Sequence, residues 1–293
     1  MPRRKKTIQD GGNTLRTESE LHRQNPASES GKVGWFVDPR VVGLVKSQVE
    51  NVTRINQRRA QFVGTAIELF SRNGYHATTV KEIAEAAGVS PGLIYQYVTD
   101  KEDILFLALQ LIVHTNKLVI PAATQGLSDP VDRFIAAFEA YCRVFDANRS
   151  ACLLTYRESK SLHRHHLDAI KNMEMETNKM IIDCVTDCIE QGYFRNLNVE
   201  IFVYQTIMIA HTWALKYWRL GKITDIDEYI RLNADALMNI ALTREGWSRY
   251  LDRVRTENAD GKSKAGSLEK KTGKAGPFRT PQQTGTVAFG TGG

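Results

Sequence analysis

The segment TVKEIAEAAGVSPGLIYQYVTDK, residues 79–101, constrains the fold of this chain more than any other stretch. Thr79 followed by Glu82 forms a capping box, in which two side chains satisfy backbone N–H groups left open at a helix start. Gly88 ends that helix and provides the backbone freedom of a tight turn. Pro91 suits the first position of a second helix, where a missing N–H costs nothing. The segment therefore predicts a helix-turn-helix.

The second helix of this pair, Pro91–Val98, is short and nearly uncharged. A helix of this length does not stabilise itself in water, so its exposed polar face is better explained as a reading surface for the major groove of DNA. We predict that base edges are contacted by Ser90, Pro91, Gly92, Leu93 and Gln96. Phosphates are predicted to be contacted by Thr79, Tyr95, Tyr97 and Lys101.

Residues 54–112 resemble the DNA-binding domain of the TetR family of transcriptional regulators. The shared pattern is AxELFxxxGYxxTTVxEIAxxAGVSxGxxYxYxxxKEDIL, which this chain carries from Ala66 to Leu105. The chain departs from the family at Val98, where phenylalanine is usual, and at Leu93, often threonine or alanine. Leu93 removes one hydrogen bond to DNA and leaves an apolar group that can touch a thymine methyl.

The resemblance implies an all-α protein with an N-terminal three-helix helix-turn-helix DNA-binding domain and a C-terminal helical-bundle domain for ligand binding and dimerisation. It implies double-stranded operator DNA and a second copy of the chain as partners, and a small-molecule effector rather than a cofactor. We divide the chain into a basic arm (1–33), an extra helix (34–53), the DNA-binding domain (54–101, helix-turn-helix 79–98), the regulatory domain (102–254) and a basic tail (255–293).

Both ends of the chain lack apolar periodicity and are predicted to be disordered. Residues 1–33 hold seven Lys or Arg against four Asp or Glu, and residues 255–293 hold seven against three, within a net charge of +6. The middle of the chain is therefore close to neutral, so overall charge alone does not indicate DNA binding. The run of Arg3, Arg4, Lys5 and Lys6 is either a solvated tail or a basic arm that adds DNA affinity.

Helix start and stop signals predict helix after helix and no strands. Valines at helical spacing after Asp38 and Pro39 predict an extra helix near 38–51. Thr99 with Glu102 predicts the start of a helix that ends before Pro121. The same signals predict a helix that starts at Asp129 and Pro130 and runs to about residue 148, and further elements over residues 151–159 and 161–191. They also predict a helix that begins at Asn198 and runs to 220, and a last one, capped by Asp225, to about residue 244.

The predicted helix 199–219 is apolar or aromatic on nearly every side. A surface helix buries only one stripe, so this pattern predicts burial on two sides, against the body and against a second subunit. The last helix has the same character. The family resemblance assigns the dimer contact to Val199–Leu220 and Ile226–Thr243, and a symmetric pair of reading helices fits a two-fold symmetric operator.

The regulatory domain mixes apolar residues with polar groups that suit a ligand pocket, but a bundle core with a polar rim has the same composition. We predict effector contacts from Tyr141, Arg157, His166, Tyr204 and Trp213. The domain also loosely resembles TetR-type repressors of acyl-CoA metabolism, which implies an acyl-CoA effector. The tract His163–His166 suggests metal, but adjacent histidines on a helix diverge, so we predict a solvated surface and no metal site.

Several functions are disfavoured by what the sequence lacks. It has no phosphate-binding glycine loop and no zinc-protease motif, so an enzyme is not predicted. The four cysteines lack CxxC spacing and no apolar leader opens the chain, so we expect free thiols and a cytoplasmic location without a membrane partner. An effector-independent or architectural DNA-binding protein remains the alternative to a ligand-responsive repressor.

Overall fold

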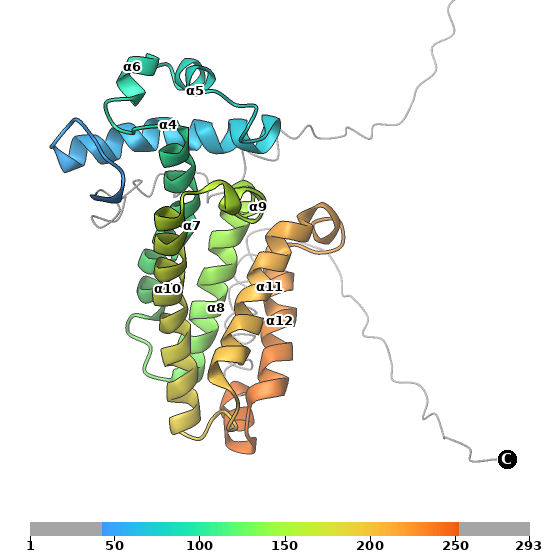
Figure 1. Cartoon of the computed structure of the whole chain (residues 1–293). Helices are drawn as coiled ribbons and strands as arrows, with labels where there is room; N and C mark the ends of the chain where they lie inside the picture. The colour runs from blue at the N-terminus through green and yellow to red at the C-terminus, as the bar shows by residue number, and fades with distance from the viewer. Residues whose placement is uncertain (1–42, 252–293) are drawn as a thin grey trace, which may run out of the picture. The chain divides into compact units, whose positions relative to one another are not determined.

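The computed structural model describes residues 43–251, which fold into helices joined by turns (Figure 1). No strand occurs in this described range; its one isolated bridge joins Phe194 and Leu242. The predicted all-α class is confirmed. The predicted arm and tail, with the run Arg3–Lys6, lie outside the described residues. The helices are α4 (Val52–Asn73), α5 (Val80–Ala86), α6 (Pro91–Ile94), α7 (Lys101–Thr124), α8 (Pro130–Ala147), α9 (Arg149–Glu158), η1 (Ser159–Ser161), α10 (Arg164–Glu190), α11 (Val199–Leu220) and α12 (Ile226–Ala241).

The helix-turn-helix forms as its sequence predicts. The Thr79 hydroxyl accepts from the backbone N–H of Glu82, and the Glu82 carboxylate accepts from the backbone N–H of Thr79, which completes the capping box at α5. Gly88 takes a φ of 67°, in the left-handed region that favours glycine. Ser90 caps α6, and Ile94 on α6 is completely buried. The buried Ile94 side chain therefore holds the four-residue helix α6 against the domain.

The extra helix predicted near 38–51 is wrong over residues 45–51, which the structure shows as non-helical. Val45 is completely buried, and its carbonyl accepts a 2.7 Å hydrogen bond from Arg59 Nη2. The backbone N–H of Gln48 donates to the carbonyl of Gln96 at 2.8 Å. Tertiary hydrogen bonds to α4 and to the recognition segment thus replace the helical bonds that the valine spacing suggested.

Helix α7 connects the DNA-binding domain to the bundle, and both of its predicted ends are corrected. Its cap is Asp100, whose side chain accepts from the N–H of Asp103, rather than Thr99 with Glu102. It continues past Pro121 to Thr124, because packing of the 1% exposed Ile120 holds a last turn from which proline removes one backbone hydrogen bond. The helix is long and apolar enough to span a membrane, but most of its apolar stretch is buried inside the protein.

The remaining helices pack into a bundle around α8, which contacts α7, α10, α11 and α12 (Figure 1). The predicted caps Asp129, Asn198 and Asp225 are all formed. Helix α10 begins at Arg164 rather than 161, because η1 occupies the preceding residues. Helix α12 ends at Ala241 rather than 244, since the chain there pairs with the turn after α10 through the N–H of Thr243 and the carbonyl of Tyr193.

Residues 244–251 are helical and belong to a separate compact unit that begins at Arg244. All four cysteines are free thiols and buried, as expected for small packing residues. Burial raises the pKa of the Cys184 thiol, which keeps it protonated and unreactive.

Candidate DNA interface and effector cavity

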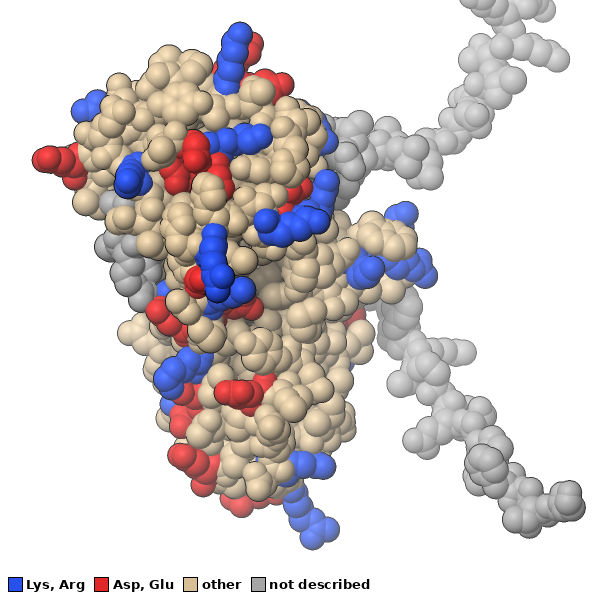
Figure 2. Space-filling view, viewed as in Figure 1, with Lys and Arg blue, Asp and Glu red and all other residues tan. Residues whose placement is uncertain are grey.

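The recognition segment presents a small, mostly uncharged surface. Ser90, Pro91, Gly92, Tyr95 and Gln96 are exposed, and Leu93 is half-buried. These side chains are therefore accessible to DNA, and their roles at the base edges and, for Tyr95, at a phosphate stay predictions. In Figure 2 the upper part of the protein carries Lys and Arg interspersed with Asp and Glu rather than a single basic patch on this face.

The predicted phosphate contact of Tyr97 is wrong in this structure. Tyr97 is completely buried, and its hydroxyl has no hydrogen-bond partner within the described part of the chain. Its carbonyl accepts from Arg59 Nε at 3.0 Å and from Arg59 Nη2 at 2.9 Å. Tyr97 thus anchors the recognition segment to α4 from inside the domain, and its side chain does not reach DNA.

The Lys101 ammonium is also hydrogen-bonded within the protein. Its ammonium donates to the carbonyls of Tyr75 and Thr78, both at 2.9 Å, and of His76 at 3.3 Å. It lies 4.5 Å from the centre of the Tyr75 ring, and burial lowers its pKa. Since an ammonium has three donors, Lys101 has none left for a phosphate. Its role is to hold the α4–α5 turn, which corrects the prediction.

The phosphate contact of Thr79 stays a prediction, because its side chain already has a partner. Thr79 is exposed, but Glu82 accepts from both its hydroxyl, at 2.8 Å, and its backbone N–H, at 2.7 Å. A phosphate would have to displace that carboxylate to be bound by Thr79.

A basic groove along α4 was missed by the sequence reasoning. The groove is lined by Asn51, Thr53, Arg54, Gln57, Arg58 and Gln61. It borders the helix-turn-helix, because Gln61 Nε2 donates to the carbonyl of Ala87 at 3.3 Å. Two arginines spaced i,i+4 at the start of the first family helix were the available signal. Arginine and amide donors in this arrangement suit phosphate oxygens.

An apolar cavity of about 60 Å³ lies inside the bundle. Helices α7 to α11 all contribute to its wall, so it reports on their packing. The lining residues are Leu109, Ile112, Val113, Asn116, Tyr141, Phe145, Cys152, Thr155, Tyr156, Ile170, Glu174, Thr177, Asn178 and His211. It is smaller than the roughly 300–1,000 Å³ of drug-sized ligand pockets, so a large ligand requires the helices to separate.

A hydrogen-bonded chain crosses one side of this cavity. His211 Nε2 lies 3.1 Å from the Tyr141 hydroxyl, and His211 Nδ1 lies 2.6 Å from the Tyr156 hydroxyl. Burial lowers the pKa of His211 to about 4, so the ring is neutral. A neutral imidazole has one donor and one acceptor, so a single tautomer satisfies both phenols. Tyr156 is 49% exposed and marks the mouth of the cavity.

Polar groups without partners line another part of the wall. Asn178 is 2% exposed, and both atoms of its amide lack hydrogen bonds to the described residues, as does Oδ1 of the equally buried Asn116. Glu174 lies on the same helix as Asn178, and burial raises the pKa of its carboxyl. Buried polar groups normally have partners. The cavity therefore has unsatisfied donors and acceptors for a polar ligand.

Comparisons with known proteins agree with this architecture. Residues 63–108 match the model of the bacterial regulatory proteins of the tetR family, and residues 127–239 match the tetracyclin repressor-like C-terminal domain. The HTH-type transcriptional regulator HbdR of Aromatoleum sp. (strain CIB) is 41% identical over 202 residues, which cover 69% of this chain and 88% of that protein. This chain belongs to the TetR family. It is a TetR-family transcriptional regulator and is related to repressors of metabolic genes.

More distant relatives share the fold. The transcriptional repressor KstR2 of Mycobacterium tuberculosis (strain ATCC 25618 / H37Rv) is 26% identical over 57% of this chain and 84% of its own length. The structure of the ketosteroid transcriptional regulator KstR2 of Mycobacterium tuberculosis superposes with a TM-score of 0.55 at 20% identity, over 68% of this chain and 99% of that one. A tetR-family regulatory protein from Rhodococcus RHA1 gives 0.58 at 22% identity, over 63% and 97%.

Within this TetR-family bundle, Tyr141 is the one residue of the five predicted effector contacts that lines the cavity. Trp213 donates from Nε1 to Asp146 at 2.7 Å, away from the lining. The other three are an exposed Arg157, a 49% exposed Tyr204 and a buried His166 that pairs with Glu102. Asn116 and Asn178 were missed because their convergence depends on helix packing.

The last two helices of this TetR-family chain leave several large apolar side chains exposed. These residues, called here the α11–α12 face, are Ile201, Tyr204, Met208, Trp218, Leu232 and Ile240, each at least 43% exposed. Ile201, Tyr204 and Met208 follow i, i+3, i+7 spacing, so they share one side of α11. The opposite side of α11 packs into the core through Val203, Ile207 and Trp213.

Proposed function

We propose that this protein is a ligand-responsive repressor that binds a palindromic operator as a dimer and releases it when a small, partly apolar molecule enters the bundle. The observation that carries the proposal is the cavity itself, because it combines apolar walls with buried amide groups that lack partners. Its wall includes α7, which continues directly from the DNA-binding domain. A ligand that favours a different packing of α7 therefore changes DNA affinity.

The lining favours an effector whose buried part is uncharged. It contains no Lys or Arg, and its one carboxyl, Glu174, has a raised pKa. A free carboxylate placed there would be desolvated without a cation. The acyl group of a thioester is neutral and has a carbonyl that can accept from the Asn178 amide or a tyrosine hydroxyl. An acyl-CoA is thus favoured over its free acid, with the CoA outside the mouth beside Tyr156.

The α11–α12 face supports the dimer in this proposal. A patch of this kind on a single chain would expose large apolar side chains to water, and such surfaces mark protein contacts. Two copies related by a two-fold axis would cover the same residues on each. Paired reading helices then contact two half-sites of the operator.

The test is to titrate acyl-CoA thioesters, their free acids and CoA itself into the protein bound to an operator identified by genomic fragment selection. Release of the operator by a thioester, at concentrations where the free acid has no effect, supports the proposal. The Asn178→Leu variant should retain DNA affinity and lose the response. Operator binding that no small molecule changes would favour the effector-independent alternative.

A further inference from the structure

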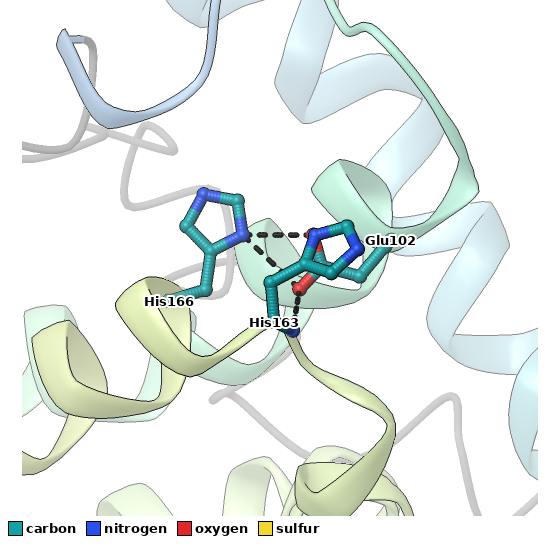
Figure 3. A group of neighbouring side chains, drawn as sticks. All are labelled: Glu102, His163 and His166. Carbon is teal, nitrogen blue, oxygen red and sulfur yellow. Dashed lines mark hydrogen bonds and ion pairs between the residues drawn. The ribbon is translucent and has the colours of Figure 1, made fainter.

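Three side chains meet where the DNA-binding domain joins the bundle, away from the cavity (Figure 3). Glu102 lies in the first turn of α7, and His163 and His166 lie at the start of α10. His163 Nδ1 is 3.1 Å and His166 Nδ1 is 2.8 Å from the same carboxylate oxygen, Glu102 Oε2. One ligand atom from each residue lies within 4.8 Å of the other two.

The backbone explains why both rings face one carboxylate. His163 is the N-cap of α10 and His166 is three residues later, so their side chains lie on the same side of the helix start. His165 is not a member of the cluster, although its ring centre lies only 4.0 Å from that of His166. The predicted solvated surface is wrong for His166, which is 1% exposed. The sequence did not suggest Glu102 as the third member, because it lies far away in the chain.

We infer that Glu102, His163 and His166 form a binding site for a divalent transition metal of the zinc type, with water as the fourth ligand. Two imidazoles and a carboxylate are a ligand set that zinc uses when one position stays open. Ligand atoms of a tetrahedral zinc site lie about 3.4 Å apart, from bond lengths near 2.0–2.1 Å. The two N–O separations at Glu102 Oε2 need to lengthen by only a few tenths of an ångström to admit the ion.

The outer contacts of the three ligands fit the same reading. Metal-bound histidines usually donate their other N–H to a carbonyl or carboxylate. His166 Nε2 lies 3.4 Å from the carbonyl of Leu44 and 3.9 Å from Asp103 Oδ1. The His166 ring stacks on Phe106 with centres 4.0 Å apart. These contacts orient the ring with Nδ1 toward the proposed metal.

Glu102 is oriented in a comparable way. Its second oxygen, Oε1, accepts from the backbone N–H of His163 at 2.8 Å and also lies 3.1 Å from His166 Nδ1, whereas Oε2 is the oxygen that both rings approach. His163 is 59% exposed at its side chain, which leaves a path for the ion and a place for water.

The test is calorimetric titration of Zn²⁺ and absorption titration of Co²⁺ with tag-free, chelator-treated full-length protein. We expect one ion per chain with a tetrahedral Co²⁺ spectrum. His163→Ala should weaken binding at least tenfold, and exposure of this side chain makes the variant safe for folding. His165→Ala, in the same tract but outside the cluster, should bind as the parent does.

Binding that is absent, or equal in the parent and His163→Ala proteins, overturns the inference. Glu102→Gln provides a second check, because it keeps the shape of the side chain and removes the anionic ligand. If that variant does not fold, the comparison of His163→Ala with His165→Ala still decides. The measurement needs neither DNA nor an effector, so its outcome is independent of the proposed repressor function.

Discussion

Arg59 and Tyr97 are joined by two hydrogen bonds to a single carbonyl, from Nε at 3.0 Å and from Nη2 at 2.9 Å. Arg59 is completely buried, and burial lowers its pKa to about 10. The same guanidinium also holds the carbonyl of Val45. One side chain of α4 thus fixes both the recognition segment and the chain that precedes α4.

Arg59→Lys should therefore lower the free energy of unfolding by about 2–4 kcal/mol, because one ammonium does not reproduce the planar fork and leaves buried carbonyls unpaired. Urea unfolding measures the change. Arg58→Lys, one residue earlier and partly exposed, is the matched control and should be nearly neutral. Equal stability of both variants would contradict this role for Arg59.

Gln96 and its neighbour Tyr97 should respond in opposite ways. Gln96→Ala should relax base preference at one operator position by about 1–3 kcal/mol, if the amide reads an adenine. Tyr97→Phe should leave DNA binding unchanged and stability equal or higher, since it removes a buried hydroxyl that has no partner in the described structure. Binding to a panel of single-base operator variants measures the base preference of both variants, and urea unfolding measures the stability of Tyr97→Phe. An unchanged preference in Gln96→Ala would remove it from the reading surface.

Phosphate binding should depend on Arg54 rather than on Lys101. Arg54→Ala should weaken binding to all sequences and reduce the slope of log K against log salt by about 0.9, as one lost phosphate contact does. Lys101→Met should instead destabilise the fold, because three carbonyls lose their donor. Lys171→Ala, exposed on α10, is the control for general charge effects. A salt slope unaffected by Arg54→Ala would exclude the α4 groove from the interface.

Met208→Glu should prevent dimer formation, because a charge in the centre of the α11–α12 face would be desolvated without a partner. Met208 is suited to this test because it is exposed on that face, whereas its neighbour Ile209 is only partly exposed and its carbonyl accepts from the Tyr229 hydroxyl. Analytical ultracentrifugation measures the change in mass. Met175→Glu makes the same substitution at an exposed methionine of α10 and should stay dimeric. A dimer in both variants would place the interface elsewhere.

His211 should make the stability of the protein depend on pH. Its folded pKa is about 4 against an ordinary 6.5. Between about pH 6.5 and pH 4 the unfolded chain therefore binds a proton at His211 and the folded chain does not. Stability is lost as the pH falls through this range. Between pH 7.5 and 5 the loss is about 2 kcal/mol. His211→Gln should lose about that much less than the parent in urea unfolding at the two pH values. Equal losses in the two proteins would mean that His211 is not held neutral.

Local chemistry predicted the helix starts that depend on one short segment. The capping box of Thr79 and the caps Asn198 and Asp225 are visible in the sequence because cap and helix are contiguous. The α7 cap was assigned one residue early, since Thr99 and Asp100 are both competent residues. Only the backbone conformation decides between them.

Long-range contacts defeated the same reasoning. Residues 45–51 have helical valine spacing, yet the Val45 carbonyl accepts from Arg59 and the Gln48 N–H donates to Gln96 instead of to helical neighbours. The cavity joins Asn116, Asn178 and His211 from three helices, and no spacing rule brings these together. Tyr97 is buried and its carbonyl accepts from Arg59, a residue that in the sequence looks like any surface charge.

Helix α7 connects the cavity to the DNA-binding domain, so a movement of the helix at one is transmitted to the other. It is continuous from Lys101 to Thr124, and the first cavity residue, Leu109, is two turns from its start. Those eight residues span about 12 Å, so a tilt of about 10° at the cavity displaces Lys101 by about 2 Å. Since the Lys101 ammonium is held by three carbonyls of the turn between α4 and α5, the displacement passes into that turn. In a dimer the displacement occurs at both ends and doubles the change in spacing between half-sites.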